Sequence, residues 1–396
     1  MHRYLMRKYI FTVIFMISLF AISICYVVAD FDSIVNDFKK ASDPDELADS
    51  IDASIEDNIM YKEELVELFG FTHILLDKKE NNGFDIVVDK DGIMYYSQRP
   101  YADSTEVMAE RVSRIEAAVK DTDTQVLAFI MPDKYVEEKG NYYPGIPYRN
   151  GNAYVDEYIQ SLEKRNITYV DFRNTIINSD LPLDELFYKT DHHWNEQAAF
   201  LAYKDAVSFF KETYGLDLDP EGIYTNENSY NFKTYEDIML GSMGRKTGII
   251  YGGMEDFSVM YPKHETNIKV VYQSMEDSEE YEYTGSFENT LLNLKFLQEE
   301  DVYVRDCYTA FAGGINHKIS IVNEDNTEGP KVLMLMDSFS SPFNLFFIQS
   351  CSEIEGYWIT ELPEDIEDIM VEGEYDYIIV STYVESLGLG NFSFFE

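Results

Sequence analysis

The sequence predicts an α/β fold in which helices flank a parallel sheet. Short, continuous apolar segments alternate with segments of helical period in two separate blocks of the chain. Strands that are apolar on both faces are typical of parallel sheets covered by helices. The chain has 396 residues, of which 45% are hydrophobic, so it can fill a large core.

The first block of this alternation follows a predicted hairpin. The Asp89-Lys90-Asp91-Gly92 turn joins two short strands at 84–88 and 93–96. Beyond it, apolar runs predict strands over 125–131 and 167–172. Helical spacing of apolar residues predicts the intervening helices, over 106–120, 153–164 and 195–214.

The second block repeats the pattern at the carboxyl end of the chain. Its predicted strands and helices alternate in the order 332–336, 342–350, 356–360, 363–370 and 375–381, beginning and ending with a strand. Residues 217–326 are irregular and rich in Tyr, Glu, Asn and Gly, which indicates an antiparallel or loop-rich insertion beside the sheet. The expected division is a helical stalk or cap over 30–82, then a catalytic domain over 83–396 that contains this insertion.

The first 29 residues differ from the rest. Arg3, Arg7 and Lys8 precede the uncharged run 9–29, a pattern typical of a signal anchor or of a signal peptide. The run is long enough to span a bilayer as a helix and ends in a passable cleavage site at Ala29. We expect a domain outside the cytoplasm, held at the cell membrane by one N-terminal helix or secreted after cleavage.

Charge and cysteine content exclude several classes of protein. There are 73 acidic and 31 basic residues, a net charge of −42, so a nucleic-acid partner is not expected. Cys307 and Cys351 are the two cysteines beyond the N-terminal segment. They form either one disulfide or two buried thiols, of which the thiols are favoured, and their spacing does not decide between the two. The cysteines lack zinc-site spacing.

The motif Asp191-His192-His193-Trp194 carries the strongest chemical signal. A carboxylate two residues before a histidine lies on the same face of an extended segment, whereas His192 is expected to point away. Ser338 follows the apolar strand that ends at Met336, a position where many folds place a nucleophile. Together Ser338, His193 and Asp191 predict nucleophile, base and orienting carboxylate of an acyl-transfer triad. The alternative for Ser338 is a helix cap.

Further candidates surround this triad in the prediction. The N–H of Ser338 and the Gly313-Gly314 turn with Asn316 are candidate oxyanion donors, although a simple tight turn is the alternative. The ring of Trp194 is a candidate wall for a sugar, or a core residue. Arg245 is a candidate for an anionic substrate, or lies in a solvated loop. A metal bound by the Asp-His-His run is the competing use of that motif, but adjacent ligands splay apart, so neither metal nor cofactor is expected.

These motifs resemble the bacterial DHHW proteins. Residues 186–195 and 334–339 carry the likeness, which extends over about 83–396 and includes the run 130–134. Lys134 in that run is a further candidate for binding the oxyanion or the substrate. The DHHW proteins are similar to alginate O-acetyltransferases of the AlgJ and AlgX type, within the SGNH-hydrolase-like group. The resemblance implies an SGNH-like fold, with catalytic roles for Asp191, His193 and Ser338.

The implied activity is O-acyl transfer, in particular O-acetyl transfer, to a cell-envelope polysaccharide. The acyl donor would be delivered by a membrane-bound O-acyltransferase. Two alternatives stay open. A water acceptor would make the chain a carbohydrate acetyl esterase with the same triad, and an inert site would make it a non-catalytic glycan-binding scaffold.

Overall fold

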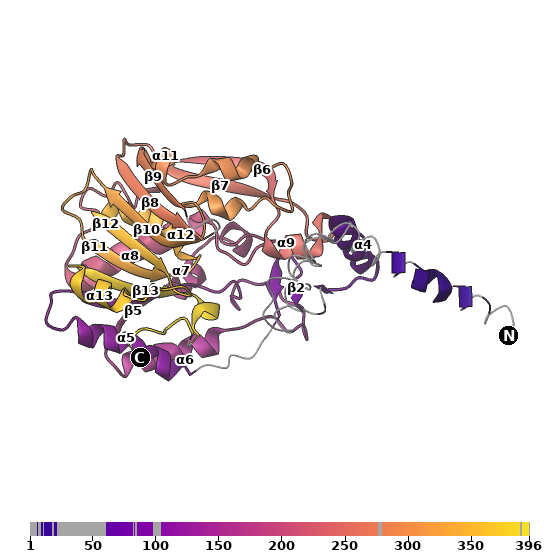
Figure 1. Ribbon diagram of the computed structural model, residues 1–396, viewed down its shortest axis with the longest axis horizontal. Helices are drawn as coiled ribbons and strands as arrows, with labels where there is room; N and C mark the ends of the chain where they lie inside the picture. The colour runs from indigo at the N-terminus through magenta and orange to yellow at the C-terminus, as the bar shows by residue number, and fades with distance from the viewer. Residues whose placement is uncertain are drawn as a thin grey trace, which may run out of the picture. The chain divides into compact units, whose positions relative to one another are not determined.

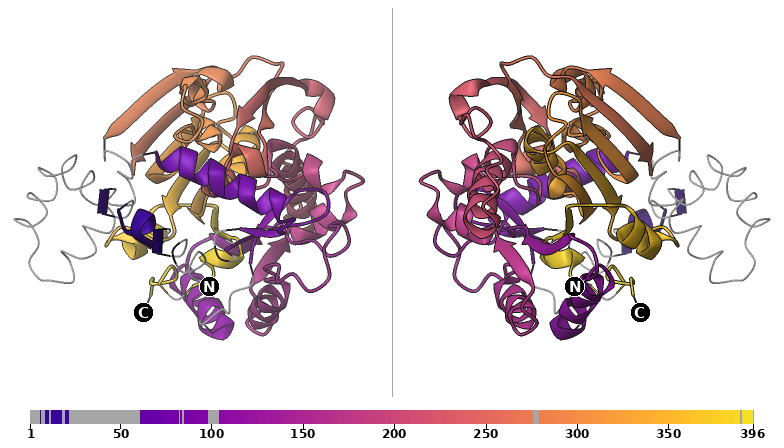
Figure 2. Two further views of the ribbon diagram at one scale, coloured as in Figure 1. Left: turned by 90° about the vertical axis from the view of Figure 1, so that its right-hand side faces the viewer. Right: turned by 90° about the vertical axis from the view of Figure 1, so that its left-hand side faces the viewer.

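The computed structural model describes residues 6, 9–10, 12–17, 20–21, 61–81, 83, 85–97, 104–275, 279–388 and 390–395. The chain divides into two compact units, Met1–Phe69 and Gly70–Glu396. The predicted domain boundaries at 29/30 and 82/83 stay predictions. The larger unit carries the sheet and all the candidate site residues (Figures 1 and 2).

An eight-stranded mixed sheet forms the centre of the larger unit. Five neighbouring strands are parallel, in the order β5 (Thr168–Asp171), β4 (Gln125–Ile130), β13 (Tyr377–Thr382), β11 (Lys331–Met336) and β12 (Glu353–Trp358). Three antiparallel strands extend it, in the order β10 (Asn316–Asn323), β8 (Ile268–Ser274) and β9 (Glu280–Gly285). The predicted parallel arrangement is therefore correct for five of the eight strands of this sheet. The α/β class is confirmed, and the sheet as a whole is mixed.

Helices flank this sheet on both faces (Figure 1). The longer ones are α5 (Thr105–Ala118), α6 (Asn152–Glu163), α8 (Glu196–Tyr214), α12 (Ser340–Phe347) and α13 (Ile366–Glu372). Helix α5 packs on α6, and α8 packs on α12. Phe129 of β4 meets Phe343 of α12 with ring centroids 5.7 Å apart, and Phe210 of α8 meets Tyr377 of β13 at 4.9 Å. The apolar strands predicted from sequence are thus buried by aromatic side chains.

Shorter elements complete the larger unit. A small sheet contains β1 (Glu80–Asn81), β2 (Ile86–Val88) and β3 (Met94–Tyr96), of which β2 and β3 are the predicted hairpin, and a second pairs β6 (Tyr230–Met239) with β7 (Glu255–Pro262). The short α-helices are α7 (Arg173–Asn178), α9 (Ser242–Thr247), α10 (Ile249–Gly252) and α11 (Phe287–Thr290). Single 3-10 turns are η2 (Leu183–Glu185), η3 (Glu227–Ser229), η4 (Leu294–Gln298), η5 (Cys307–Ala310), η6 (Ile348–Ser350) and η7 (Val384–Ser386).

Two sequence predictions about the sheet need correction. The segment 217–326 follows the antiparallel alternative and not the loop-rich one, and it does not lie beside the sheet, because β8, β9 and β10 come from it and are bonded into the main sheet. Strand β12 begins at Glu353, three residues before the predicted start. The added residues include Glu355, a charged residue on the strand. Its carboxylate pairs with Lys318 of the neighbouring β10, at 2.6 Å.

The predicted membrane anchor in residues 1–29 is contradicted. Among the residues described above, no helix combines the length and the apolar character needed to cross a membrane. Much of that segment, and residues 30–60 of the predicted stalk, lie outside the described residues. Within the stalk range the structure has α4 (Lys62–Leu75). Cys307 and Cys351 are buried free thiols, as the sequence favoured.

Candidate active site

The Asp191-His192-His193-Trp194 motif forms a bend in front of α8. Phe187 and Trp194 form an isolated antiparallel bridge, and the N–H of Tyr188 donates to the carbonyl of His193 across it. The side chain of Asn195 then accepts from the N–H of Ala198 and caps α8. The motif is therefore a tight loop held at both ends, not the extended segment expected from sequence.

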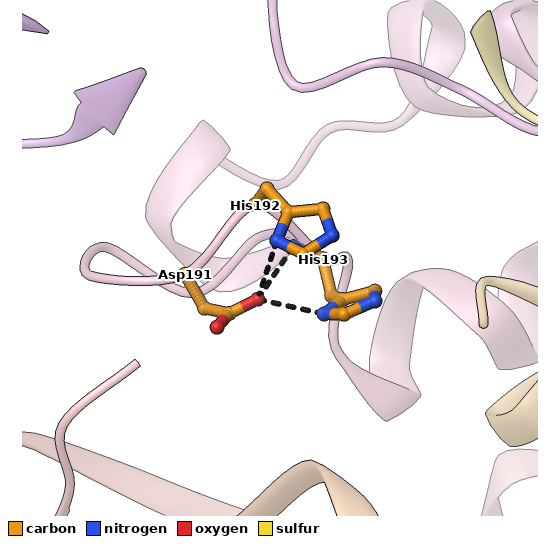
Figure 3. Close-up of side chains that lie close together, drawn as sticks. All are labelled: Asp191, His192 and His193. Carbon is orange, nitrogen blue, oxygen red and sulfur yellow. Dashed lines mark hydrogen bonds and ion pairs between the residues drawn. The ribbon is translucent and has the colours of Figure 1, made fainter. Parts of the chain in front are cut away.

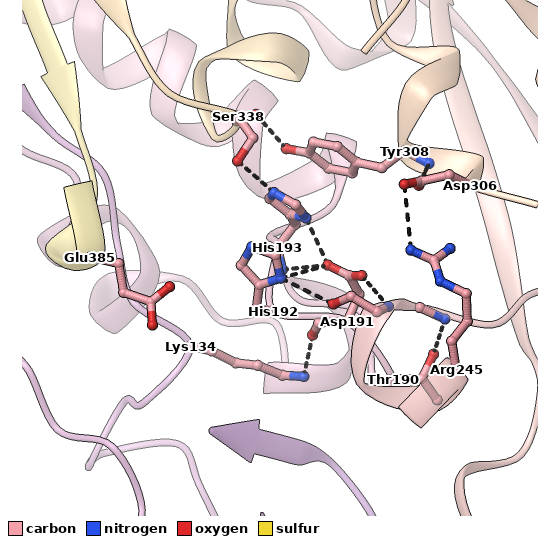
Figure 4. Close-up of polar contacts among 12 residues, drawn as sticks. Lys134, Thr190, Asp191, His192, His193, Arg245, Asp306, Tyr308, Ser338 and Glu385 are labelled. Atoms are coloured by element: carbon pink, nitrogen blue, oxygen red, sulfur yellow. Dashed lines mark hydrogen bonds and ion pairs between the residues drawn. The ribbon is translucent and has the colours of Figure 1, made fainter. Parts of the chain in front are cut away.

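Ser338, His193 and Asp191 meet at this bend (Figure 4). The Nε2 atom of His193 lies 2.7 Å from Ser338 Oγ, and its Nδ1 atom lies 2.7 Å from Asp191 Oδ1. Asp191 Oδ1 also accepts the backbone N–H of His193, at 3.0 Å, and Oδ2 accepts the N–H of Ser242, at 2.7 Å. The hydroxyl, the imidazole and the carboxylate thus lie in one continuous hydrogen-bonded line, which is the arrangement expected of an acyl-transfer triad.

Ser338 lies just beyond the carboxyl end of β11. Asp337, not Ser338, ties the following turn: its Oδ1 accepts the N–H of Phe339 and its Oδ2 accepts that of Tyr383. Burial raises the pKa of this Asp337 carboxyl to about 6. The residue that caps α12 is Phe339, so the hydroxyl of Ser338 is not used as a cap and faces His193.

Burial and neighbouring charges set the protonation states of His193 and Asp191. Burial lowers the pKa of His193 to about 4, with a further lowering by His192 that the Asp191 carboxylate only partly offsets. Burial alone would raise the pKa of Asp191, but the two histidines and their hydrogen bonds hold it well below its ordinary value. At neutral pH the imidazole is therefore neutral and the carboxylate charged, as a general base requires.

The two cations predicted for the site, Lys134 and Arg245, contact backbone carbonyls next to it. The Lys134 ammonium is buried and donates to the backbone carbonyls of Asp191, at 2.7 Å, and Lys189, at 3.1 Å. Burial lowers the pKa of Lys134 to about 8. Arg245 donates to the carbonyl of Arg305 at 3.0 Å and pairs with Asp306 at 3.5 Å. Both cations therefore support the loops that carry the site.

The remaining sequence candidates lie elsewhere. Trp194 is fully buried and its indole N–H donates to the carbonyl of Phe339 at 2.9 Å, so its ring packs in the core and offers no face to a sugar. Gly313 and Gly314 adopt positive φ, and the Asn316 amide donates to the carbonyls of Ala312 and Gly314. This is the tight-turn alternative, and Gly313 lines a separate pocket of about 440 Å³.

The sequence analysis missed Tyr308 and predicted the wrong direction for His192. Tyr308 of η5 stacks on His193, with ring centroids 3.8 Å apart and planes at 12°. His192 does not point away: its Nδ1 lies 3.3 Å from Asp191 Oδ1, and its ring centroid lies 3.8 Å from that of His193 (Figure 3). The bend brings both histidines to one carboxylate. Tyr308 carried no local signal, because it comes from the segment read as irregular.

The same bend gathers ligand atoms of Asp191, His192 and His193 within 4.8 Å of one another. These atoms are already committed within the protein. Both ring nitrogens of His193 and both oxygens of Asp191 have hydrogen-bond partners at 2.7 Å. A metal would have to replace those bonds, so the arrangement fits proton transfer better than metal binding.

Comparisons with known proteins agree with the fold. Residues 86–239 match the family model of the SGNH hydrolase-like domain, acetyltransferase AlgX. The predicted resemblance is confirmed. No curated protein matches the chain. The matched residues include the motif bend, so the bend lies in the part of the chain that is similar to this family of acetyltransferases.

Solved structures share the fold. A DHHW family protein from Eubacterium siraeum is 19% identical, with a TM-score of 0.54, over 76% of this chain and 91% of that one. Bacillus cereus PatB1 with a sulfonyl adduct is 14% identical, with a TM-score of 0.60, over 78% of this chain and 97% of that one. At these identities the likeness concerns the fold.

Proposed function

We propose that this protein is an O-acetyltransferase that moves an acetyl group from a donor to a hydroxyl of a polysaccharide, through Ser338, His193 and Asp191. The observation that carries the proposal is the pair of 2.7 Å contacts made by the two ring nitrogens of His193, one to Ser338 and one to a buried carboxylate. The family match to an AlgX acetyltransferase domain supports the reaction class.

The proposed reaction has two balanced halves. Ser338 Oγ attacks the carbonyl carbon of the donor and its proton passes to His193 Nε2, which then gives that proton to the departing donor group. The acetyl group is now an ester of Ser338. A sugar hydroxyl gives its proton to His193 and attacks this ester, and Ser338 leaves as it regains the proton. Asp191 stabilises the imidazolium in both halves.

The oxyanion that forms in each half needs hydrogen-bond donors. The N–H of Ser338, at the turn between β11 and α12, is the candidate that the sequence and the geometry share. The Gly313–Asn316 turn is not proposed for this role, because its amide is committed to its own backbone.

An aryl acetate burst assay tests the proposal on the purified chain. We expect rapid release of about one equivalent of aryl alcohol, then a slower steady state, with both lost in Ser338→Ala and His193→Ala. Ser341→Ala, three positions further along, removes a buried serine hydroxyl outside the triad; it is the control and should keep the burst. A sulfonyl fluoride should label Ser338, a probe suggested by the sulfonyl adduct of PatB1.

The acceptor is then identified by adding oligosaccharides of different composition to the acylated protein. Acetyl found on a sugar supports the transferase, whereas acetate formed at the same rate with and without sugar would make the chain an esterase. Full activity in Ser338→Ala would refute the triad. No burst and no label with any donor would favour a glycan-binding scaffold.

A further inference from the structure

Tyr308 covers one face of the His193 imidazole. Their ring centroids are 3.8 Å apart and their planes differ by 12°, which is close to parallel stacking (Figure 4). The tyrosine ring is itself fixed edge-on by Phe311, at 5.4 Å and 87°, and by Tyr188, at 6.4 Å and 88°. Its plane is therefore set by the core and not by the histidine.

The hydroxyl of the same tyrosine reaches the nucleophile's backbone. Tyr308 Oη donates to the carbonyl oxygen of Ser338, at 3.0 Å. The side chain is buried, with 6% of its surface exposed, and burial holds the pKa of the phenol well above its ordinary value. The phenol is therefore protonated at neutral pH and remains a hydrogen-bond donor there.

Polar contacts of Asp306 and Arg245 hold the backbone of Tyr308 in place. The side chain of Asp306 caps η5 by accepting the N–H of Tyr308 at 3.1 Å, and the same carboxylate pairs with Arg245. Arg245 also donates to the carbonyl of Arg305, the residue before Asp306. The basic residue that stood out in an acidic sequence thus anchors the turn that presents Tyr308.

We propose that Tyr308 is a positioning residue that holds the His193 ring and the Ser338 backbone in register with one rigid side chain, and that its ring face stabilises the imidazolium formed during transfer. The inference rests on the proposed function. Stacking fixes the plane of the imidazole, and therefore the direction of Nε2, while the phenol bond fixes the turn that carries Oγ. One aromatic residue is in contact with both partners of the 2.7 Å proton-transfer pair.

The positive charge on His193 gives the ring face a second role. When His193 takes the proton of Ser338, it becomes a desolvated cation against an aromatic face, an arrangement that favours the charged form. The other groups that act on His193 are Asp191, which favours the cation, and His192 and Lys134, which oppose it. Asp191 contacts the ring at Nδ1 whereas Tyr308 covers its face, so the two residues contribute separately.

Two substitutions separate the ring from the hydroxyl. Tyr308→Leu keeps an apolar filling but removes the aromatic face, and it should lower the His193 pKa by about one unit and kcat for aryl acetate about tenfold. Tyr308→Phe keeps the face, so the His193 pKa should stay unchanged while kcat falls about threefold through a looser Ser338 turn. The pKa is read from the imidazole signals of His193 by NMR across a pH titration.

The matched control is Tyr272→Leu, which removes a buried tyrosine that stacks on Tyr281 in the antiparallel extension, and it should change neither quantity. A folded Tyr308→Leu protein with wild-type His193 pKa and kcat would overturn the proposal. If that variant does not fold, an unchanged kcat in Tyr308→Phe overturns it instead. The NMR shift does not need turnover, so it tests the stack even if the wild-type chain transfers no acetyl group.

Discussion

Replacing the buried carboxylate of the site by its neutral isostere, Asp191→Asn, is the most direct test of the electrostatics. Asp191 is 4% exposed and accepts three N–H groups, from the ring and backbone of His193 and from the backbone of Ser242. An amide of the same shape carries no charge and offers only one oxygen. Its NH2 group must therefore lie opposite one of these N–H groups, and two donors are then left without an acceptor between them.

The expected loss follows from the charge that forms on His193. At about 4 Å and an effective dielectric constant of about 20, a carboxylate and an imidazolium attract by about 4 kcal/mol. Losing that attraction in the transition state lowers kcat by about a thousandfold, since each 1.36 kcal/mol is about tenfold. The assay is the aryl acetate burst and steady state, with the fold checked by thermal unfolding.

The matched control is Asp184→Asn, a carboxylate seven positions earlier that is about two-fifths exposed and pairs with Lys189. A surface pair of this kind contributes little, so kcat should stay within twofold. The reasoning is refuted if Asp191→Asn keeps kcat within tenfold of the wild type while Ser338→Ala is inactive. The carboxylate would then orient the ring without stabilising its charge.

Three further outcomes are expected. Because burial lowers the pKa of His193 to about 4, the neutral base persists as pH falls below 6.5, and kcat/KM should decline only as pH approaches about 4. Gly241→Ala would place a Cβ 2.5 Å from the Cβ of Asp191 and should lower kcat about a hundredfold by displacing that loop. Trp194→Phe leaves the buried carbonyl of Phe339 without its donor, so urea unfolding should show a loss of about 2 kcal/mol.

Each of these outcomes has its own contrary result. A pH limb at the ordinary histidine value of 6.5 would contradict the effect of burial on His193. For the glycine, Ser242→Ala is the neighbouring control, because it keeps the N–H that Asp191 accepts. Equal activity in Gly241→Ala and Ser242→Ala would contradict the close packing. An unchanged urea midpoint in Trp194→Phe would show that the Phe339 carbonyl finds another donor.

Sequence reasoning predicted the parallel half of the fold well, since apolar strands such as Gln125–Ile130 leave a continuous signal. For β8 to β10 it left antiparallel and loop-rich structure both open and set no strand bounds, because tyrosines and charges alternate there, as in β9 (Glu280–Gly285). Pairing between distant strands has no local signature. The prediction could not show that this segment closes the sheet's edge.

The same distinction holds at the site. The grouping of Asp191, His193 and Ser338 was predictable from residue types and their places in the pattern, and their catalytic roles stay a prediction. The contact of His192 with Asp191 was not, because it depends on a bend that no single residue dictates. Tyr308 could not be identified for a related reason. It is one of 31 tyrosines, and only its contact with His193 in the folded chain distinguishes it.

The loop that holds Asp191 is clamped by a distant stretch of chain. The N–H of Ser242 satisfies its carboxylate across 51 positions, and Tyr308 arrives from further still. Trimming 217–326 to obtain a minimal hydrolase would discard both. If the proposed function is right, acetyl transfer should be among the last properties gained during refolding and the first lost on partial unfolding. An activity assay would then report whether the whole unit is folded.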